Sequence, residues 1–230
     1  RLGLAAPKIS WFATRDRLAE FTFDLAMICG AVGRMGNEVY NEQRSEVNEL
    51  AEGYALGKVG SSTMPHKRNP FLPGRLAGRG RIAGTLVMRA MQCLENTNER
   101  DCRTLCIEPY HLKEICCLVD GTLDIALELF GQMEVHEDQI RYNLEILQGL
   151  IYSEALMMRL AEAYGRMEAH ELVYELAMAA IGQKRQLKEL ALADSRVTAH
   201  LTEEELENLM CPEHYTGLAE HFVDQVVGTE

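Results

Sequence analysis

One short segment gathers most of the side chains in this sequence that could carry out chemistry. Residues 57–71 read GKVGSSTMPHKRNPF. The two glycines allow backbone conformations closed to other residues, which predicts a mobile loop. That loop brings Ser61 and Ser62 close to Lys67 and Asn69, at the start of the next predicted helix.

A lysine, an asparagine amide and a helix N-terminus together favour an anion, either a carboxylate or a phosphate. A serine beside such a site is placed to take a proton from the carbon next to a bound carboxylate. Lys67 and backbone N–H groups would stabilise the resulting carbanion. Because a serine is a poor base at its ordinary pKa, it needs this electrostatic help. The same residue types also fit a glycine-rich hairpin with a solvated lysine, and the types alone favour that simpler interpretation.

Long helices must position this loop. An apolar stripe with steps of four and three residues predicts an amphipathic helix over 16–49, with Thr14 as a candidate cap. At about 1.5 Å per residue this helix would be roughly 50 Å long, a length typical of helical bundles. A second helix is predicted from Asn69 and Pro70, with Asn69 as the N-cap. A third is predicted over about 109–133.

The remaining pattern is also helical. Glycines in the second helix indicate that a neighbouring helix approaches closely, and they stand at 74, 78, 80 and 84. After Gly149 the predicted helices are shorter and cover about 150–164, 167–183, 202–209 and 216–227. The sequence therefore predicts an all-α fold. A long-helix domain over 1–146, with the candidate catalytic loop at 57–69, precedes a small helical domain over 147–230.

The composition restricts the function classes. A formal net charge of −12 argues against a nucleic-acid partner, because phosphate neutralisation needs a basic surface. Seven cysteines without a C-x-x-C pair favour free thiols in a reducing cytoplasm. Cys102, Cys106 and His111 lack a second ligand pair at zinc spacing, so we expect no metal, and no organic cofactor is implied. No apolar run reaches the roughly 18 residues that a membrane span requires.

Residues 60–70, GSSTMPHKRNP, resemble the G-S-S-x-M-P-x-K-x-N signature of the aspartase/fumarase (fumarate lyase) superfamily. Residues 14–20 (TRDRLAE) and 45–49 (SEVNE) are similar to segments that flank this signature in one branch. That branch contains adenylosuccinate lyase and 3-carboxy-cis,cis-muconate cycloisomerase. The resemblance covers essentially the whole chain and reverses the preference for a simple hairpin.

The resemblance implies that a loop serine takes the proton beta to the leaving group while a general acid assists departure. By position, Ser61 is that base and Lys67 stabilises the carbanion. The residues that hold the carboxylate are then Ser62, Met64, Lys67 and Asn69. His66 matches the histidine of the M-P-H-K-R-N-P form, either as a substrate-binding residue or as a loop histidine with no direct role. The resemblance also implies a homotetramer whose active sites are each assembled from three subunits.

The substrate is less well defined by this resemblance. Arg75 is retained in the manner of the adenylosuccinate lyases, and Arg100 lies where those enzymes carry a substrate-binding arginine. Leu105 and Pro109, however, replace the serine and arginine that contact the nucleotide phosphate there, which leaves Arg103 as a possible substitute. The tryptophans of the cycloisomerases are missing from the same stretch, although residues 114–119, 148–150 and 212–219 look most like that group.

The sequence therefore predicts an enzyme that acts on a small carboxylate, most like a 3-carboxy-cis,cis-muconate cycloisomerase. The alternative is adenylosuccinate lyase, which eliminates fumarate in purine biosynthesis. A catalytically silent helical scaffold of the same fold is a second alternative, against which the intact Ser61, Lys67 and Asn69 argue. Because the resemblance places the general acid and an N-terminal domain before Arg1, we expect this chain to be the C-terminal half of an enzyme and inactive by itself.

Overall fold

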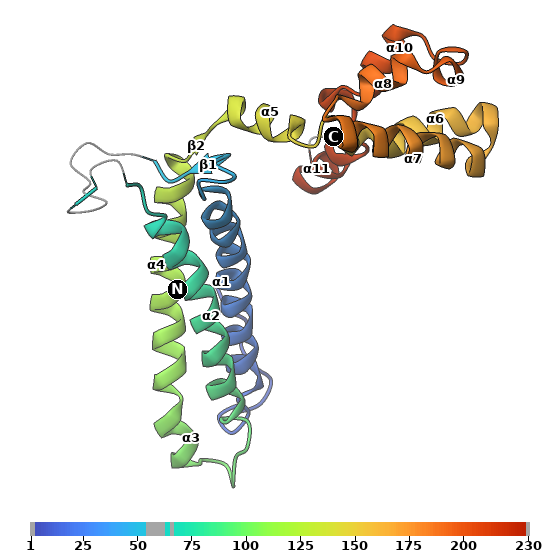
Figure 1. Cartoon of the computed structure of the whole chain (residues 1–230). Helices are drawn as coiled ribbons and strands as arrows, with labels where there is room; N and C mark the ends of the chain where they lie inside the picture. The colour runs from blue at the N-terminus through green and yellow to red at the C-terminus, as the bar shows by residue number, and fades with distance from the viewer. Residues whose placement is uncertain (1–2, 54–62, 65–66, 229–230) are drawn as a thin grey trace. The chain divides into compact units, whose positions relative to one another are not determined.

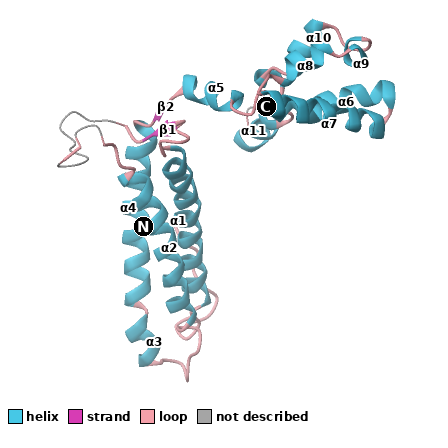
Figure 2. Cartoon of the chain, in the orientation of Figure 1, coloured by secondary structure: helices cyan, strands magenta, loops and turns pink. Residues whose placement is uncertain are grey.

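The computed structural model describes residues 3–53, 63–64 and 67–228. It divides into two compact units, Arg1–Glu137 and Asp138–Glu230. Within the described residues the chain is helical except for turns, loops and two strands of two residues each (Figure 2). The prediction of an all-α fold is therefore confirmed. The division between the units falls after Glu137, whereas the sequence analysis places the domain boundary after residue 146.

The first unit is built on three long helices that pack side by side (Figure 1). Its elements are α1 (Asp16–Glu42), β1 (Leu50–Ala51), α2 (Phe71–Met91), α3 (Cys102–Ile107), α4 (Pro109–Gly131) and β2 (Glu134–Val135). The predicted starts of the first and third helices are confirmed at Asp16 and Pro109. The first helix ends seven residues earlier than predicted, because its apolar stripe ends at Val39 and none of residues 40–49 is fully buried.

Glycines let α1 and α2 approach closely, as predicted for Gly80. A Cβ atom on Gly80 would lie 2.9 Å from the carbonyl oxygen of Cys29, and one on Gly36 would lie 2.5 Å from the Cβ of Leu76. Any side chain at either position would force the backbones apart. Gly78 and Gly84 have no atom of this chain within 4 Å of such a Cβ, so the prediction fails for them within one subunit.

A small sheet of two antiparallel strands, β1 and β2, closes the first unit at one end of the helices. Leu50 pairs with Val135, and Ala51 pairs with Glu134. This sheet joins the segment that follows α1 to the segment that follows α4. The backbone N–H of His136 extends the ladder by donating to the carbonyl of Glu49 at 2.9 Å. This end of the unit carries the residues that flank the signature loop.

The second unit is a cluster of shorter helices around an apolar core of leucine, alanine and valine. Its elements are α5 (Glu137–Glu145), η1 (Leu150–Tyr152), α6 (Ser153–Tyr164), α7 (Arg166–Gln183), α8 (Leu187–Ala193), α9 (Ser195–Thr198), α10 (Glu203–Leu209), η2 (Pro212–His214) and α11 (Ala219–Val227). Thr202 caps α10 in a reciprocal capping box with Glu205, which positions that helix where the sequence predicts one. Among the described helices of both units, none combines the length and apolar character of a membrane span.

Candidate active site

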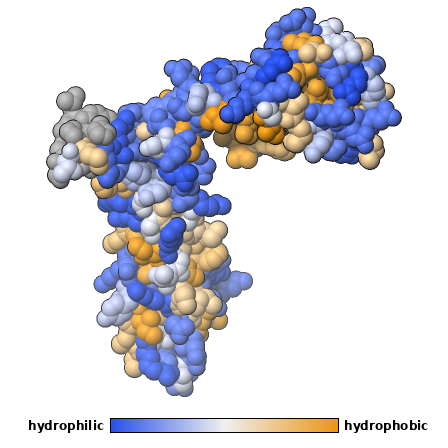
Figure 3. Space-filling model, in the orientation of Figure 1, coloured by the Kyte–Doolittle hydropathy of each residue, from blue (hydrophilic) through white to orange (hydrophobic). Residues whose placement is uncertain are grey.

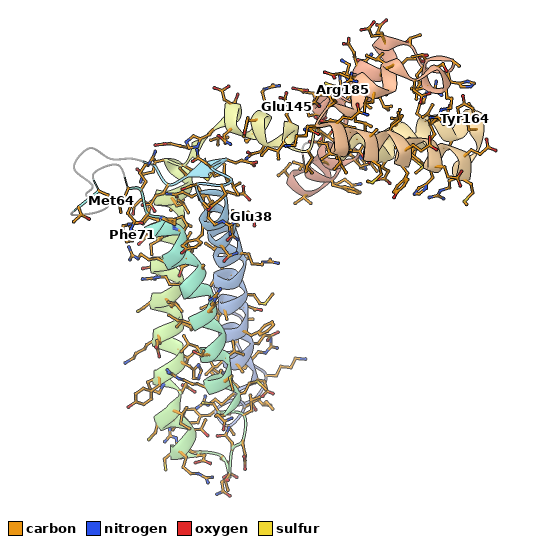
Figure 4. All side chains as sticks on the ribbon, in the orientation of Figure 1. Glu38, Met64, Phe71, Glu145, Tyr164 and Arg185 are labelled. Atoms are coloured by element: carbon orange, nitrogen blue, oxygen red, sulfur yellow. The ribbon has the colours of Figure 1, made fainter. Side chains whose placement is uncertain are left out.

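An open groove lies at the end of the first unit that carries the β1–β2 sheet, and five residues of the signature line it: Met64, Lys67, Arg68, Asn69 and Pro70. The groove has a volume of about 680 Å³. It is lined by Tyr40, Gln43, Arg44, Ser45, Asn48, Ala51, Met64, Lys67, Arg68, Asn69, Pro70 and His136. The structure thus brings together Met64, Lys67 and Asn69, which the sequence analysis assigns to carboxylate binding. Figure 4 shows Met64 and Phe71 at this same end of the unit.

Three of the predicted site residues cannot be located. Ser61, Ser62 and His66 lie outside the described residues, so the predicted base and its neighbours stay predictions. The described residues on either side of that gap do have positions. Gly53 precedes it, and Lys67 follows it with its backbone N–H donating to the carbonyl of Met64 at 3.0 Å.

Positively charged side chains dominate the groove. Arg44, Lys67 and Arg68 line it, together with His136. No carboxylate side chain is among the lining residues, although Glu134 pairs with Arg68 beside them. A groove of this charge attracts an anion, and arginine and lysine are the side chains that bind carboxylates best.

The N-terminus of α2 is occupied by a carboxylate of the protein itself. Glu52 is only 4% exposed, and its Oε2 accepts a hydrogen bond of 2.8 Å from the backbone N–H of Leu72 in the first turn. The N-cap is Pro70, with no side-chain cap bond, so the prediction of Asn69 as the cap is wrong. The physical reason is that the buried carboxylate of Glu52, from a distant segment, satisfies the helix more strongly than an amide would.

The two predicted binding arginines are not in the groove. Arg75 is exposed on α2 and is not one of the lining residues. Arg100 follows the opposite end of α2, where its guanidinium carbon lies 4.5 Å from the centre of the Phe12 ring. Since α2 has 21 residues, these two ends are about 30 Å apart. One subunit alone therefore does not bring Arg100 to Lys67.

Arg103, considered above as a substitute phosphate ligand, is held by its own loop. Its Nε and Nη2 atoms donate to the carboxylate of Asp101 at 2.9 Å and 2.6 Å. Its Nη2 also donates to the hydroxyl of Thr97 at 2.7 Å. The hydrogen bond from Arg103 is the largest cause that holds the pKa of Asp101 well below its usual range. These contacts stabilise the start of α3, where Asp101 is the N-cap.

Metal binding has no support in the described part of the chain. No group of three or more His, Cys, Asp or Glu side chains there is arranged to hold an ion. Cys93 and His111 are buried side by side, with Sγ and Nε2 at 3.7 Å, but Cys102 and Cys106 are exposed. The structure therefore does not bring the Cys102, Cys106 and His111 set together as ligands.

Sequence reasoning missed several residues that build this site. Glu52, Arg68 and Glu134 fix the segments around the groove, and Arg44 adds charge to its wall. Arg68 is part of the signature, but the sequence analysis gives it no role. Glu52 and Glu134 had no local signal, because their partners lie 20 and 66 residues away in sequence.

Comparison with known families matches both parts of the chain. The family described as "Lyase" matches residues 2–78, and "Adenylosuccinate lyase C-terminus" matches residues 149–226. The first match includes the whole signature and the first turns of α2. The second covers most of the second unit.

Similar proteins extend along the whole chain. It is 38% identical over 230 residues to N-acetyl-S-(2-succino)cysteine lyase of Dickeya dadantii, covering 99% of this chain and 50% of that protein. It is 40% identical over 217 residues to adenylosuccinate lyase of Methanocaldococcus jannaschii, covering 94% of this chain and 47% of that protein. The solved structure of 3-carboxy-cis,cis-muconate lactonizing enzyme from Pseudomonas putida superposes with a TM-score of 0.89 at 36% identity, covering 98% of this chain and 50% of that one.

The described residues form a helical domain with a groove beside the signature, lined by Arg44, Lys67 and Arg68. With these matches, the chain belongs to the aspartase/fumarase (fumarate lyase) superfamily, in the branch of adenylosuccinate lyase and 3-carboxy-cis,cis-muconate cycloisomerase. The chain spans about half the length of the curated relatives it matches.

Proposed function

We propose that the protein is a lyase or cycloisomerase that removes a proton beside a carboxylate of a small organic acid. Ser61 is the base, Lys67 stabilises the carbanion, and Ser62, Met64, His66 and Asn69 hold the carboxylate. The observation that carries this proposal is the groove in which Met64, Lys67 and Asn69 converge with Arg44. A catalytically silent scaffold has no need for a positively charged groove at this place.

Within this chemistry we favour a substrate like 3-carboxy-cis,cis-muconate, which has no phosphate. The contacts of Arg103 with Asp101 and Thr97 support this choice, because they engage two of the three nitrogens of the guanidinium that would otherwise replace the missing phosphate ligands. The second candidate is adenylosuccinate, favoured by the match of residues 149–226 to the C-terminal family of adenylosuccinate lyases. The similarity to a lyase of N-acetyl-S-(2-succino)cysteine adds a third compound to test.

The site as proposed needs more than one subunit. Arg75 and Arg100 remain proposed binding residues, and the separation of about 30 Å between Arg100 and Lys67 supports their meeting only across a homotetramer. The same assembly would cover the apolar side chains that the long helices expose (Figure 3). We also propose a cytoplasmic location, supported by the seven cysteines, all of which are free thiols.

The test is a spectrophotometric turnover assay on the full-length protein with the three compounds in parallel. We expect one of them to be converted, and the Ser61→Ala variant to lose at least about 100-fold in kcat, because a base contributes roughly that much or more. Ser195→Ala, a serine in α9 outside the signature, is the matched control and should keep full activity. Unchanged kcat in Ser61→Ala, with an active wild type, would remove Ser61 from the mechanism.

A further inference from the structure

We propose that Arg68 is a positioning residue that ties together the two chain segments on either side of the signature serines. This inference rests on the proposed function, because it concerns how Lys67 and Asn69 are held at the groove. Arg68 lies between those two residues in sequence, and its own side chain points to protein groups outside the signature: the carboxylate of Glu134 and the carbonyl oxygen of Glu52.

The contacts of Arg68 require a guanidinium. Nη1 donates to Oε2 of Glu134 at 2.9 Å, and Nη2 lies 2.8 Å from Oε1 of the same carboxylate. Nη2 also donates to the carbonyl oxygen of Glu52 at 2.7 Å. Such a paired contact fixes orientation as well as distance, and a lysine, whose three donors share one nitrogen, cannot reproduce its planar geometry. Arg68 therefore joins residues 52, 68 and 134 in one geometry.

The segment before the serines is itself fixed by contacts beside the two-stranded sheet. The backbone N–H of Glu52 donates to Oε1 of Gln43 at 2.9 Å, and its carboxylate accepts from Leu72. At Gly53 a Cβ atom would lie 2.1 Å from the carbonyl oxygen of Gln132, so the backbone can pass there only because the residue is glycine. Arg68 thus connects the far side of the signature to a segment that cannot shift by itself.

This arrangement gives the charges around the groove different tasks. The ion pair with Glu134 balances the charge of Arg68, and its bonds hold the backbone that carries Lys67 and Asn69. Lys67 and Arg44 then supply the positive charge for a bound carboxylate. Since displacements of about 1 Å at reacting groups cost up to about 100-fold in rate, loss of the Arg68 contacts should impair turnover although Arg68 does not touch the substrate.

The first test measures kcat and KM of the full-length protein with the substrate that it converts. We expect Arg68→Gln and Arg68→Lys to lower kcat/KM by about tenfold to 100-fold. Glu134→Gln should lower it too, and Arg68→Gln combined with Glu134→Gln should be no worse than Arg68→Gln alone. Likewise, Arg68→Gln should add little to Lys67→Met, because both act on the same group. Arg185→Gln, which breaks an exposed pair with Glu189 in the second unit, is the control and should not change kcat/KM.

Two results in this assay would overturn the proposal. If Arg68 bound substrate directly, releasing it from Glu134 would lower KM in Glu134→Gln. If Arg68 only added stability, its effect would simply add to that of Lys67→Met.

The second test does not depend on activity. A lysine-specific protease is applied to the native protein, well below its thermal midpoint, and cleavage after Lys58 and Lys67 is followed by mass spectrometry. We expect cleavage there to be about tenfold faster or more in Arg68→Gln and unchanged in Arg185→Gln. Wild-type inactivity with all compounds, together with faster cleavage in Arg68→Gln, would refute the proposed function and keep the tie. Equal cleavage and equal kcat/KM in wild type and Arg68→Gln would refute the tie and keep the function.

Discussion

His111 is the centre of a buried polar cluster in the first unit. It is 1% exposed, with Nδ1 3.2 Å from the hydroxyl of Thr22 and Nε2 3.7 Å from Sγ of Cys93. Nearby, Arg15 pairs with Glu108 at 3.1 Å. Burial lowers the pKa of His111, opposed by the charge of Glu108 and supported by that of Arg89. The imidazole is therefore held neutral in the folded protein.

This burial predicts a pH dependence of stability. The ordinary pKa of a histidine side chain is 6.5. As the pH falls below that value, the unfolded chain binds a proton that the folded chain does not, so the free energy of unfolding decreases. The slope cannot exceed about 1.4 kcal/mol per pH unit from one group. Urea unfolding at about pH 7.5 and about pH 5.5 should show this loss in wild type and a smaller one in His111→Gln. His170→Gln, an exposed histidine on α7, should behave as wild type; equal losses in all three proteins would contradict the prediction.

At the same scale, the sequence identified the groove residues better than their supports. Met64, Lys67 and Asn69 were found because a contiguous motif names them. Arg100 was assigned through the family resemblance, and within one chain it lies at the opposite end of α2 from Lys67. The role of Glu52 was invisible, since a carboxylate that caps a helix from 20 residues away leaves no periodic or local pattern.

At the scale of elements, the close contact of α1 and α2 is the most constrained feature. A Cβ on Gly36 would meet Leu76 Cβ at 2.5 Å and the carbonyl oxygen of Pro73 at 3.0 Å. Both of these atoms belong to the first turns of α2, next to the groove. The two helices can therefore separate only by moving the base of the signature loop.

We expect Gly36→Ala to lower the free energy of unfolding by about 1–3 kcal/mol, because overpacking at a backbone contact outweighs the better helix propensity of alanine. Gly182→Ala is the matched control in α7, where no atom lies within 4 Å of the added Cβ. It should be neutral or stabilising by up to about 1 kcal/mol. Chemical unfolding of both variants decides this, and a stabilising Gly36→Ala would contradict the described contact.

The long helices were predictable, as were the short helices α10 and α11, but four other short helices were not. A stripe of apolar residues over several turns gave α1, α2 and α4, and Thr202 with Glu205 gave the start of α10. The helices α3, α5, α8 and α9 have four to nine residues, too few for a 3.6-residue period to be recognised. Two of them shared an unused signal: Asp101 and Asp194 each accept from the backbone N–H of an arginine two residues later, in the sequences DCR and DSR.

At the scale of the whole molecule, the long helices expose more apolar surface than one chain can cover. Large apolar side chains on α1, α2 and α4 are exposed, and they include Phe21, Phe23, Met27, Ile28, Met35, Ile82, Met88, Leu123 and Leu127. Where such side chains lie next to one another, exposed apolar surface often marks an interaction site. The homotetramer proposed above would cover these side chains with further copies of the chain.

We therefore expect Leu127→Glu, at a side chain 76% exposed on α4, to reduce the proposed tetramer of the full-length protein to smaller species. Turnover should fall with the mass, since an incomplete assembly leaves incomplete sites. The control is Met167→Glu, which replaces a side chain 78% exposed on α7 in the second unit. Light scattering after gel filtration gives the mass, and an unchanged tetramer in Leu127→Glu would exclude this face of α4 from the interface.

The pairing of β1 with β2, which are far apart in sequence, also has a consequence for synthesis of the protein. Arg68 leaves the ribosome 66 residues before its partner Glu134. At about 5–20 residues per second, the partner follows roughly 3–13 s later. During that interval α1 and α2 can already pack, while the strand that completes the support of the groove does not yet exist. The pair of helices α1 and α2 can therefore form first on the nascent chain, and the support of the groove by Glu134 is complete only after α4 has been made.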